Sequence, residues 1–169
     1  MKCFESFFRV AAVAVALAAA IIGVAAEAGA QSTAAVQSTI GILTDSSRST
    51  ADRANAARDL AVLAQDSDAA TQALIGVLAG DPDPAVRAAA ARALGHQAFP
   101  SAAPIQAAVQ ALSSDTSAEV RLAAVQALNI LAVDSASGTA ALQTAAANDP
   151  DPGVRQAAQA VYARLTSGG

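Results

Sequence analysis

The chain is short of the side chains that proteins use for cross-linking and for stacking. Its 169 residues include one cysteine, Cys3, no tryptophan and only 3% aromatic residues. A single thiol excludes an internal disulfide and leaves no cysteine cluster for a metal ion. Few aromatic rings disfavour a cavity for a large conjugated ligand. A stable core must therefore come from aliphatic packing.

Basic residues are also scarce. Lys2 is the only lysine, and the formal net charge is −4. Nucleic acids and anionic membranes are bound by clustered Lys and Arg side chains. The composition therefore predicts no nucleic-acid partner.

The residues that carry catalysis or bind metals are isolated. His96 is the only histidine, and the chain has neither a Gly-x-Ser-x-Gly motif nor a phosphate-binding glycine loop. Asp81 with Asp83, and Asp149 with Asp151, resemble parts of a calcium loop, but its third acid, glycine and distal glutamate are missing. Helix capping explains these aspartates better. We expect no catalytic residue, no metal and no cofactor.

The N-terminus has the pattern of an export signal. Lys2 and Arg9 precede the uncharged apolar run Val10–Ala26, and Ala28-Gly29-Ala30 forms an A-x-A cleavage site. We predict a signal peptide over residues 1–30, removed after Ala30, followed by a short segment over residues 31–37.

An uncleaved membrane anchor is the alternative, because 17 apolar residues lie at the short limit for spanning a bilayer. Cleavage predicts a periplasmic or secreted protein, and a retained segment predicts a membrane-anchored one.

The remaining sequence favours helices. Hydrophobic residues make up 54% of the chain, and many of them are alanine, the best helix former. The β-branched and aromatic residues typical of sheets are comparatively few. We therefore predict an all-α fold.

An internal repeat organises the chain. Arg53, Arg87, Arg121 and Arg155 follow one another at intervals of 34 residues, which indicates an array of similar units. We predict a repeat domain over residues 38–166, with units near 38–65, 71–99, 104–131 and 138–165.

Each unit contains two helical patterns separated by a short turn. In the second unit a first helix stops near Gly80, and Asp83 is predicted to cap a second helix that begins at Pro84. Asp151 has the same place in the fourth unit, and Ser117 in the third. The second helices carry an inward-facing apolar row, Val86, Ala89, Ala90, Ala93 and Leu94 in the second unit and Val120, Ala123, Ala124, Ala127 and Leu128 in the third. Pairs of this kind must stack on one another to bury these rows.

The repeated segment resembles the HEAT-repeat family. Asp81-Pro-Asp-Pro-Ala-Val-Arg87, followed by alanines and Leu94, is most similar to the short bacterial form that also occurs in phycobilisome lyases. The resemblance implies an α-solenoid of about four helix pairs. It also implies a structural ladder of hydrogen bonds between adjacent turns, made by Asp81, Arg87, Asp115, Arg121, Asp149 and Arg155, with the aspartate and arginine of a unit satisfying each other.

The first unit departs from this pattern. It has Ser47 in the place of the turn aspartate and Asp52 in the place of the valine. A more polar unit is expected at the end of an array, where one neighbour is missing.

A second row on the second helices is the predicted binding surface. It lies opposite the inward row and is mostly small and apolar, with Leu122 and Val125 at its centre. Arg58, Arg92 and Gln126 lie beside it. We hypothesise that this row lines a concave groove that receives an apolar or helical partner segment, while the arginines bind acidic groups. Alternatively, the small residues only allow neighbouring second helices to pack closely.

Together these features predict an exported, non-catalytic module that binds another protein or peptide. A chromophore-handling protein like the lyases is a competing interpretation, disfavoured because only Phe99 and Tyr162 remain aromatic after signal removal. A membrane-tethered structural spacer is the third. The oligomeric state stays open.

Overall fold

The computed structural model describes residues 32–96, 102–132 and 135–167. The predicted signal peptide, its membrane-anchor alternative and Phe99 lie outside these ranges. The chain divides into two compact units, Met1–Gln37 and Ser38–Gly169, and the helix array belongs to the second. No helix within the described ranges is both long and apolar enough to cross a bilayer.

The described residues form helices joined by short turns, without a strand. One helix runs through residues 32–44. It is followed by α2 (Thr50–Leu63), α3 (Asp68–Gly80), α4 (Pro84–Leu94), α5 (Ala102–Ser114), α6 (Ala118–Leu131), α7 (Ala136–Asn148) and α8 (Pro152–Ser167). These helices form successive pairs, so the predicted all-α solenoid of about four helix pairs is confirmed.

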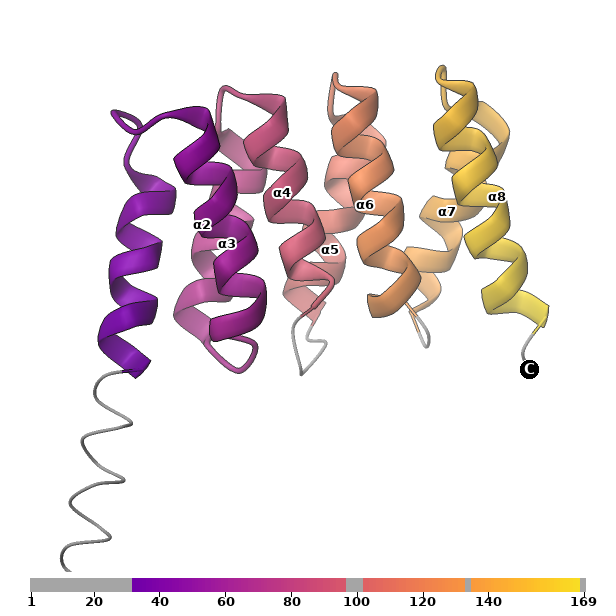
Figure 1. Cartoon of the computed structure of the whole chain (residues 1–169). Coiled ribbons are helices and arrows are strands. Elements are labelled where there is room, and N and C mark those ends of the chain that lie inside the picture. The colour runs from indigo at the N-terminus through magenta and orange to yellow at the C-terminus, as the bar shows by residue number, and fades with distance from the viewer. Residues whose placement is uncertain (1–31, 97–101, 133–134, 168–169) are drawn as a thin grey trace, which may run out of the picture. The chain divides into compact units, whose positions relative to one another are not determined.

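The helices of the second unit form two rows (Figure 1). The second helices α2, α4, α6 and α8 stand side by side in the front row, and each packs against the next. The first helices α3, α5 and α7 form the row behind and also pack against one another in order. Every pair is joined by its short turn at the upper end of Figure 1. The array is therefore a stack with two faces, one for each row.

The starts of the helices are set by capping side chains. The Asp83 carboxylate accepts a hydrogen bond from the Ala85 backbone N–H at 2.9 Å, and Asp151 accepts one from Val154 at 3.0 Å. Ser117 has the same place before α6, but its hydroxyl makes no capping bond. The prediction that it caps like the aspartates is therefore wrong.

The first helices begin earlier than the predicted unit starts. The hydroxyls of Ser67 and Ser135 cap α3 and α7, so these helices begin at residues 68 and 136, ahead of the unit starts predicted near 71 and 138. Gly80 is the last residue of α3, with Asp81 as the C-cap.

The predicted inward rows form the core. Val86, Leu94, Val120 and Leu128 are fully buried, and the alanines between them are at most 2% exposed. Burying one such Leu or Val side chain contributes about 1.5–3 kcal/mol to folding. Because alanine adds only one methyl group, the helix backbones can approach closely.

The turn of the first unit differs from the predicted alignment. Asp45, not Ser47, directly follows the first helix. Its Oδ1 accepts the Ser47 N–H at 2.9 Å, as Asp81 Oδ1 accepts the Asp83 N–H. The turn between Asp45 and α2 is two residues longer than the turn after Asp81. Asp45 is therefore the turn aspartate of this unit.

Candidate protein-binding surfaces

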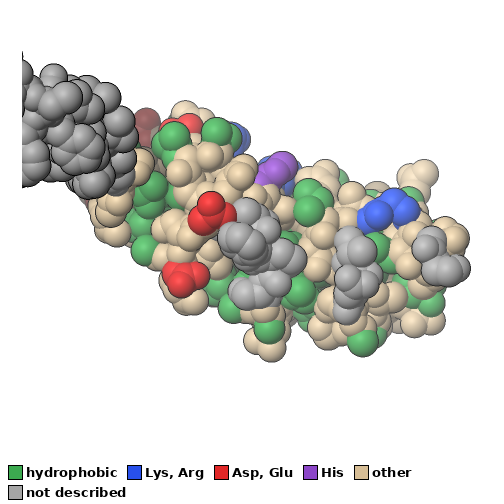
Figure 2. Space-filling view, turned by 90° about the horizontal axis from the view of Figure 1, so that it is seen from below, with side chains coloured by type: hydrophobic (Ala, Val, Ile, Leu, Met, Phe, Trp, Pro, Cys, Tyr) green, Lys and Arg blue, Asp and Glu red, His purple; other side chains and the backbone are tan. Residues whose placement is uncertain are grey.

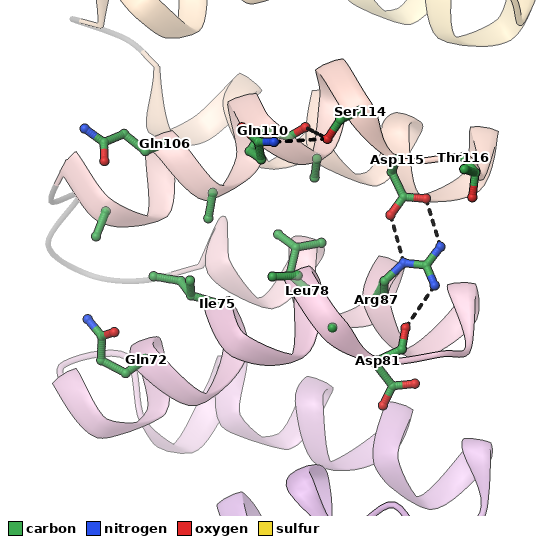
Figure 3. Close-up of a pocket in the computed structure, with 15 residues that line it drawn as sticks. Gln72, Ile75, Leu78, Asp81, Arg87, Gln106, Gln110, Ser114, Asp115 and Thr116 are labelled. Carbon is green, nitrogen blue, oxygen red and sulfur yellow. Dashed lines mark hydrogen bonds and ion pairs between the residues drawn. The ribbon is translucent and has the colours of Figure 1, made fainter.

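The repeated arginines join consecutive turns. Arg87 donates from Nε and Nη2 to the two carboxylate oxygens of Asp115 at 2.8 and 2.9 Å, and its Nη1 donates to the Asp81 carbonyl at 2.9 Å (Figure 3). Arg53 binds Asp81, and Arg121 binds Asp149, in the same two-pronged manner. We call these contacts the turn ladder. Each rung ties one unit to the next.

The hydrogen bonds join adjacent turns, as the resemblance implied, but the partners within each pair differ from the predicted ones. We expected the aspartate and arginine of one unit to satisfy each other, but the carboxylate of Asp115 binds the arginine of the preceding unit. Within a unit the arginine reaches only backbone carbonyls, as Arg121 does at Asp115 and Thr116. The carboxylate already accepts the backbone N–H two residues later and faces the preceding unit, so the arginine of its own unit does not reach it.

The turn ladder also lowers the pKa values of Asp115 and Asp149. Burial alone would raise the pKa of the Asp115 carboxyl, but the hydrogen bonds from Arg87 and from the Ser117 N–H outweigh it and lower the pKa. The same balance lowers the pKa of Asp149, where Arg121 and the Asp151 N–H are the donors. These carboxylates are ionised and occupied, so they offer little to a ligand.

Most of the predicted binding row lies between helices. Ala88, Ala91 and Val125 are at most 1% exposed, and a Cβ placed on Gly95 would lie 3.1 Å from the Ala127 Cα. The row therefore faces the neighbouring second helix. Val125 is wrong as a binding residue because no partner can reach it, and Leu122 is only partly exposed. The alternative, that small residues here allow close helix packing, describes this row.

The polar residues beside the row link neighbouring helices. Arg92 Nε donates to Gln126 Oε1 at 3.1 Å, and its Nη2 lies 3.8 Å from Glu119 Oε1. Arg164 on α8 donates to the side chain and the carbonyl of Asn129 on α6. Arg92 and Gln126 are thus brought together across α4 and α6, on the exposed face of the front row.

Arg58 and Arg92 border a groove between α2 and α4. It has a volume of about 340 Å³ and is lined by Arg58, Ala61, Val62, Gln65, Ala89, Arg92, Ala93 and His96. We call it the α2–α4 groove. Its floor is apolar, and basic groups stand at its sides. Figure 2, which views the array from below, shows histidine and basic side chains near hydrophobic ones along one edge. The sequence analysis did not include Val62 or His96 among the binding residues, although they lie 34 residues apart at equivalent positions of neighbouring units.

A larger groove lies between the first helices α3 and α5 (Figure 3). Its volume is about 780 Å³, with Ile75 and Leu78 in the floor and Gln72, Gln106 and Gln110 along the walls. Smaller grooves occupy the same place between α5 and α7 and between residues 43–46 and α3. This recurrence indicates that stacking itself produces them, because the alanine-rich second helices approach more closely than the first helices.

The described residues contain no group of three or more His, Cys, Asp or Glu side chains placed to hold a metal ion. His96 is exposed just after α4.

Comparison with known proteins gives one match. A family model described as HEAT repeats matches residues 36–129 and, in an overlapping placement, residues 71–163. No curated protein and no solved structure matches the chain. Together the two placements cover the helix pairs whose turns carry the ladder.

Proposed function

The chain belongs to the HEAT-repeat family, and from this premise we propose that it is a non-catalytic scaffold that binds an acidic segment of another protein in the α2–α4 groove. HEAT repeats commonly mediate protein–protein interactions, which is the general role of the fold. The finer assignment rests on one observation, the pair Arg58 and Arg92 above an apolar floor.

The two arginines occupy equivalent positions on neighbouring helices, at a spacing of 34 residues. Arg58 Nη1 donates to Asn55 Oδ1 at 2.7 Å and forms no ion pair among the described residues. Arg92 Nε donates to Gln126, and its Nη2 forms only a long, exposed ion pair with Glu119 at 3.8 Å. A planar guanidinium with unused donors favours carboxylates, which it binds through two parallel hydrogen bonds. Two positive charges at equivalent positions repel each other, and an anion bound between them lowers the electrostatic energy.

The apolar part of the groove favours a side chain next to that acid. Val62 is 75% exposed, and Ala61, Ala89 and Ala93 form the adjacent floor. An aliphatic residue of the partner would cover the exposed Val62 side chain, while its neighbouring Asp or Glu would meet the arginines. This pattern fits a short peptide segment better than a rigid flat surface.

Selection from a displayed peptide library tests the assignment. We expect peptides retained by the wild-type protein to be enriched in Asp or Glu beside aliphatic residues, and to lose most of their binding to Arg58→Glu. The matched control is Gln72→Glu, an exposed change on the first-helix face that should leave binding intact. Equal loss with both variants, or selected peptides without acidic residues, contradicts the proposal.

We also propose that the protein is exported, on the strength of the apolar run and the A-x-A site before Gln31. Mass spectrometry of the native protein should find an N-terminus at Gln31. An intact Met1 in the mature protein would instead support the membrane anchor.

A further inference from the structure

The turn ladder has an unused arginine on α8. Arg155 Nη1 donates to the carbonyls of Asp149 and Pro150 at 2.8 and 3.2 Å. Arg87 and Arg121 make the same two carbonyl contacts in their units. In those units Nε and Nη2 bind the next aspartate, but for Arg155 the described residues offer no such carboxylate. Within the described residues, Arg155 Nε and Nη2 thus have no carboxylate in the place where Arg87 and Arg121 have one.

The first unit has the complementary group. Asp45 occupies the ladder position. Its Oδ1 accepts the Ser47 N–H, as in the other turns, and also the Ser47 hydroxyl at 2.6 Å, which leaves Oδ2 for a cation. No arginine of a preceding unit reaches it in the described residues. Its closest cation is Arg48, 3.5 Å from Oδ2, and these two side chains are 54% (Arg48) and 42% (Asp45) exposed. Ion pairs with this exposure contribute little, so Asp45 remains available to a better-placed guanidinium.

The side chains around Arg155 and those around Asp45 also differ as hydrogen-bond donors and acceptors. On α8, Gln156 and Gln159 are exposed at the positions that Ala88 and Ala91 occupy on α4. On α2, Asp52 and Asp59 are exposed at the positions of the buried Val86 and Ala93. One face therefore presents amide and guanidinium donors, and the other presents carboxylate acceptors.

We propose that the protein associates head to tail, with Arg155 of one copy binding Asp45 of the next and continuing the turn ladder between molecules. The second copy is the occupant because it carries an aspartate in the turn geometry that the ladder arginines already bind. The side chains that distinguish the two faces are polar, so we expect the contact to be weak and sensitive to salt. A contact between two different faces produces open chains rather than closed dimers. This inference is independent of the peptide groove.

Sedimentation velocity over a range of concentrations tests the proposal. At low ionic strength the wild-type protein should sediment faster as its concentration rises, and about 0.5 M salt should return it to monomer. Arg155→Asp alone and Asp45→Arg alone should remain monomeric, because each places like charges at the contact. An equimolar mixture of the two variants should associate again, because each copy then meets a face of opposite charge.

Several results would overturn the proposal. They are a wild-type protein that stays monomeric at low salt, association that persists in Arg155→Asp, and a variant mixture that stays monomeric. Because Asp45 also accepts the Ser47 N–H, Asp45→Asn replaces Asp45→Arg if circular dichroism shows lost helix. Its amide oxygen can still accept that bond, so only the charge that binds Arg155 is lost, and association at low salt should weaken. Binding of another protein that depends on Arg155, without self-association of the chain, assigns the face to a different partner and also rejects the second copy.

Discussion

The ladder arginines join a carboxylate of the next unit to backbone carbonyls of their own unit. The rung between Arg121 and Asp149 is buried, with side chains 10% and 4% exposed. Removing one partner leaves the other charge without compensation, so Asp149→Ala should lower the free energy of unfolding by about 2–4 kcal/mol. Asp151→Ala is the matched control, because it removes only a helix cap and should cost about 1 kcal/mol. Urea unfolding measures both. Equal losses would mean that the rung contributes no more than a cap.

The ladder aspartates also predict the response to acid. The folded-state pKa values of Asp115 and Asp149 lie below the usual value of 3.8, so the unfolded chain takes up protons first as the pH falls. The stabilisation is fully present above about pH 5 and is lost as the pH drops through the lowered pKa values. Urea midpoints measured between about pH 6 and pH 3 should therefore decline. Asp115→Asn should start lower and decline less steeply, and an unchanged slope would exclude Asp115 as a source.

How closely two helices can pack at a given position depends on whether a side chain fits between them. A Cβ on Gly95 would lie 3.1 Å from the Ala127 Cα and 3.2 Å from the Arg92 carbonyl, whereas a Cβ on Gly76 meets nothing within 4 Å. Gly95→Ala should therefore force α4 and α6 apart and destabilise the protein by about 1 kcal/mol or more. Gly76→Ala should stabilise it by about 0.5–1 kcal/mol through helix propensity. Thermal unfolding of the two variants should shift in opposite directions, and shifts of the same sign would contradict the tight α4–α6 contact.

The elements also show what could be predicted from sequence. The period located the second helices because identical side chains recur where identical contacts are made, as at Val86 and Val120. The period wrongly indicated that Val125 is accessible to a partner. α6 packs against α4, α5 and α8, and the apolar row on one side of a helix does not show which of its other sides a neighbouring helix also covers. The period missed the role of Asp45 because the two extra turn residues precede Arg53 and leave the later spacing of 34 unchanged.

At the scale of the whole molecule, the sequence indicated only part of the candidate groove. Arg58 and Arg92 lie at equivalent positions 34 residues apart, and both line the α2–α4 groove. The cross-helix bond from Arg92 to Gln126 depends on side-chain conformations that no periodicity encodes. The pairing of ladder groups between units likewise required the stack itself.

The polar face of α8 is expected to limit how the array grows. On α6, Leu122 and Val125 occupy the positions that Gln156 and Gln159 occupy on α8. Giving α8 the same pair, Gln156→Leu with Gln159→Val, would expose an apolar stripe shaped to pack against another second helix. Light scattering should then show strong association that high salt strengthens, whereas salt should dissolve the contact proposed for the wild-type protein.

The matched control for this variant is Gln72→Leu with Gln106→Val, which makes the same exchange on exposed first-helix positions. Because those residues line a groove rather than a stacking face, the control should scatter light like the wild-type protein. If both double variants associate equally, general hydrophobicity is the cause. If only the α8 variant does, the two glutamines keep this face polar and leave its recognition of a second copy to Arg155.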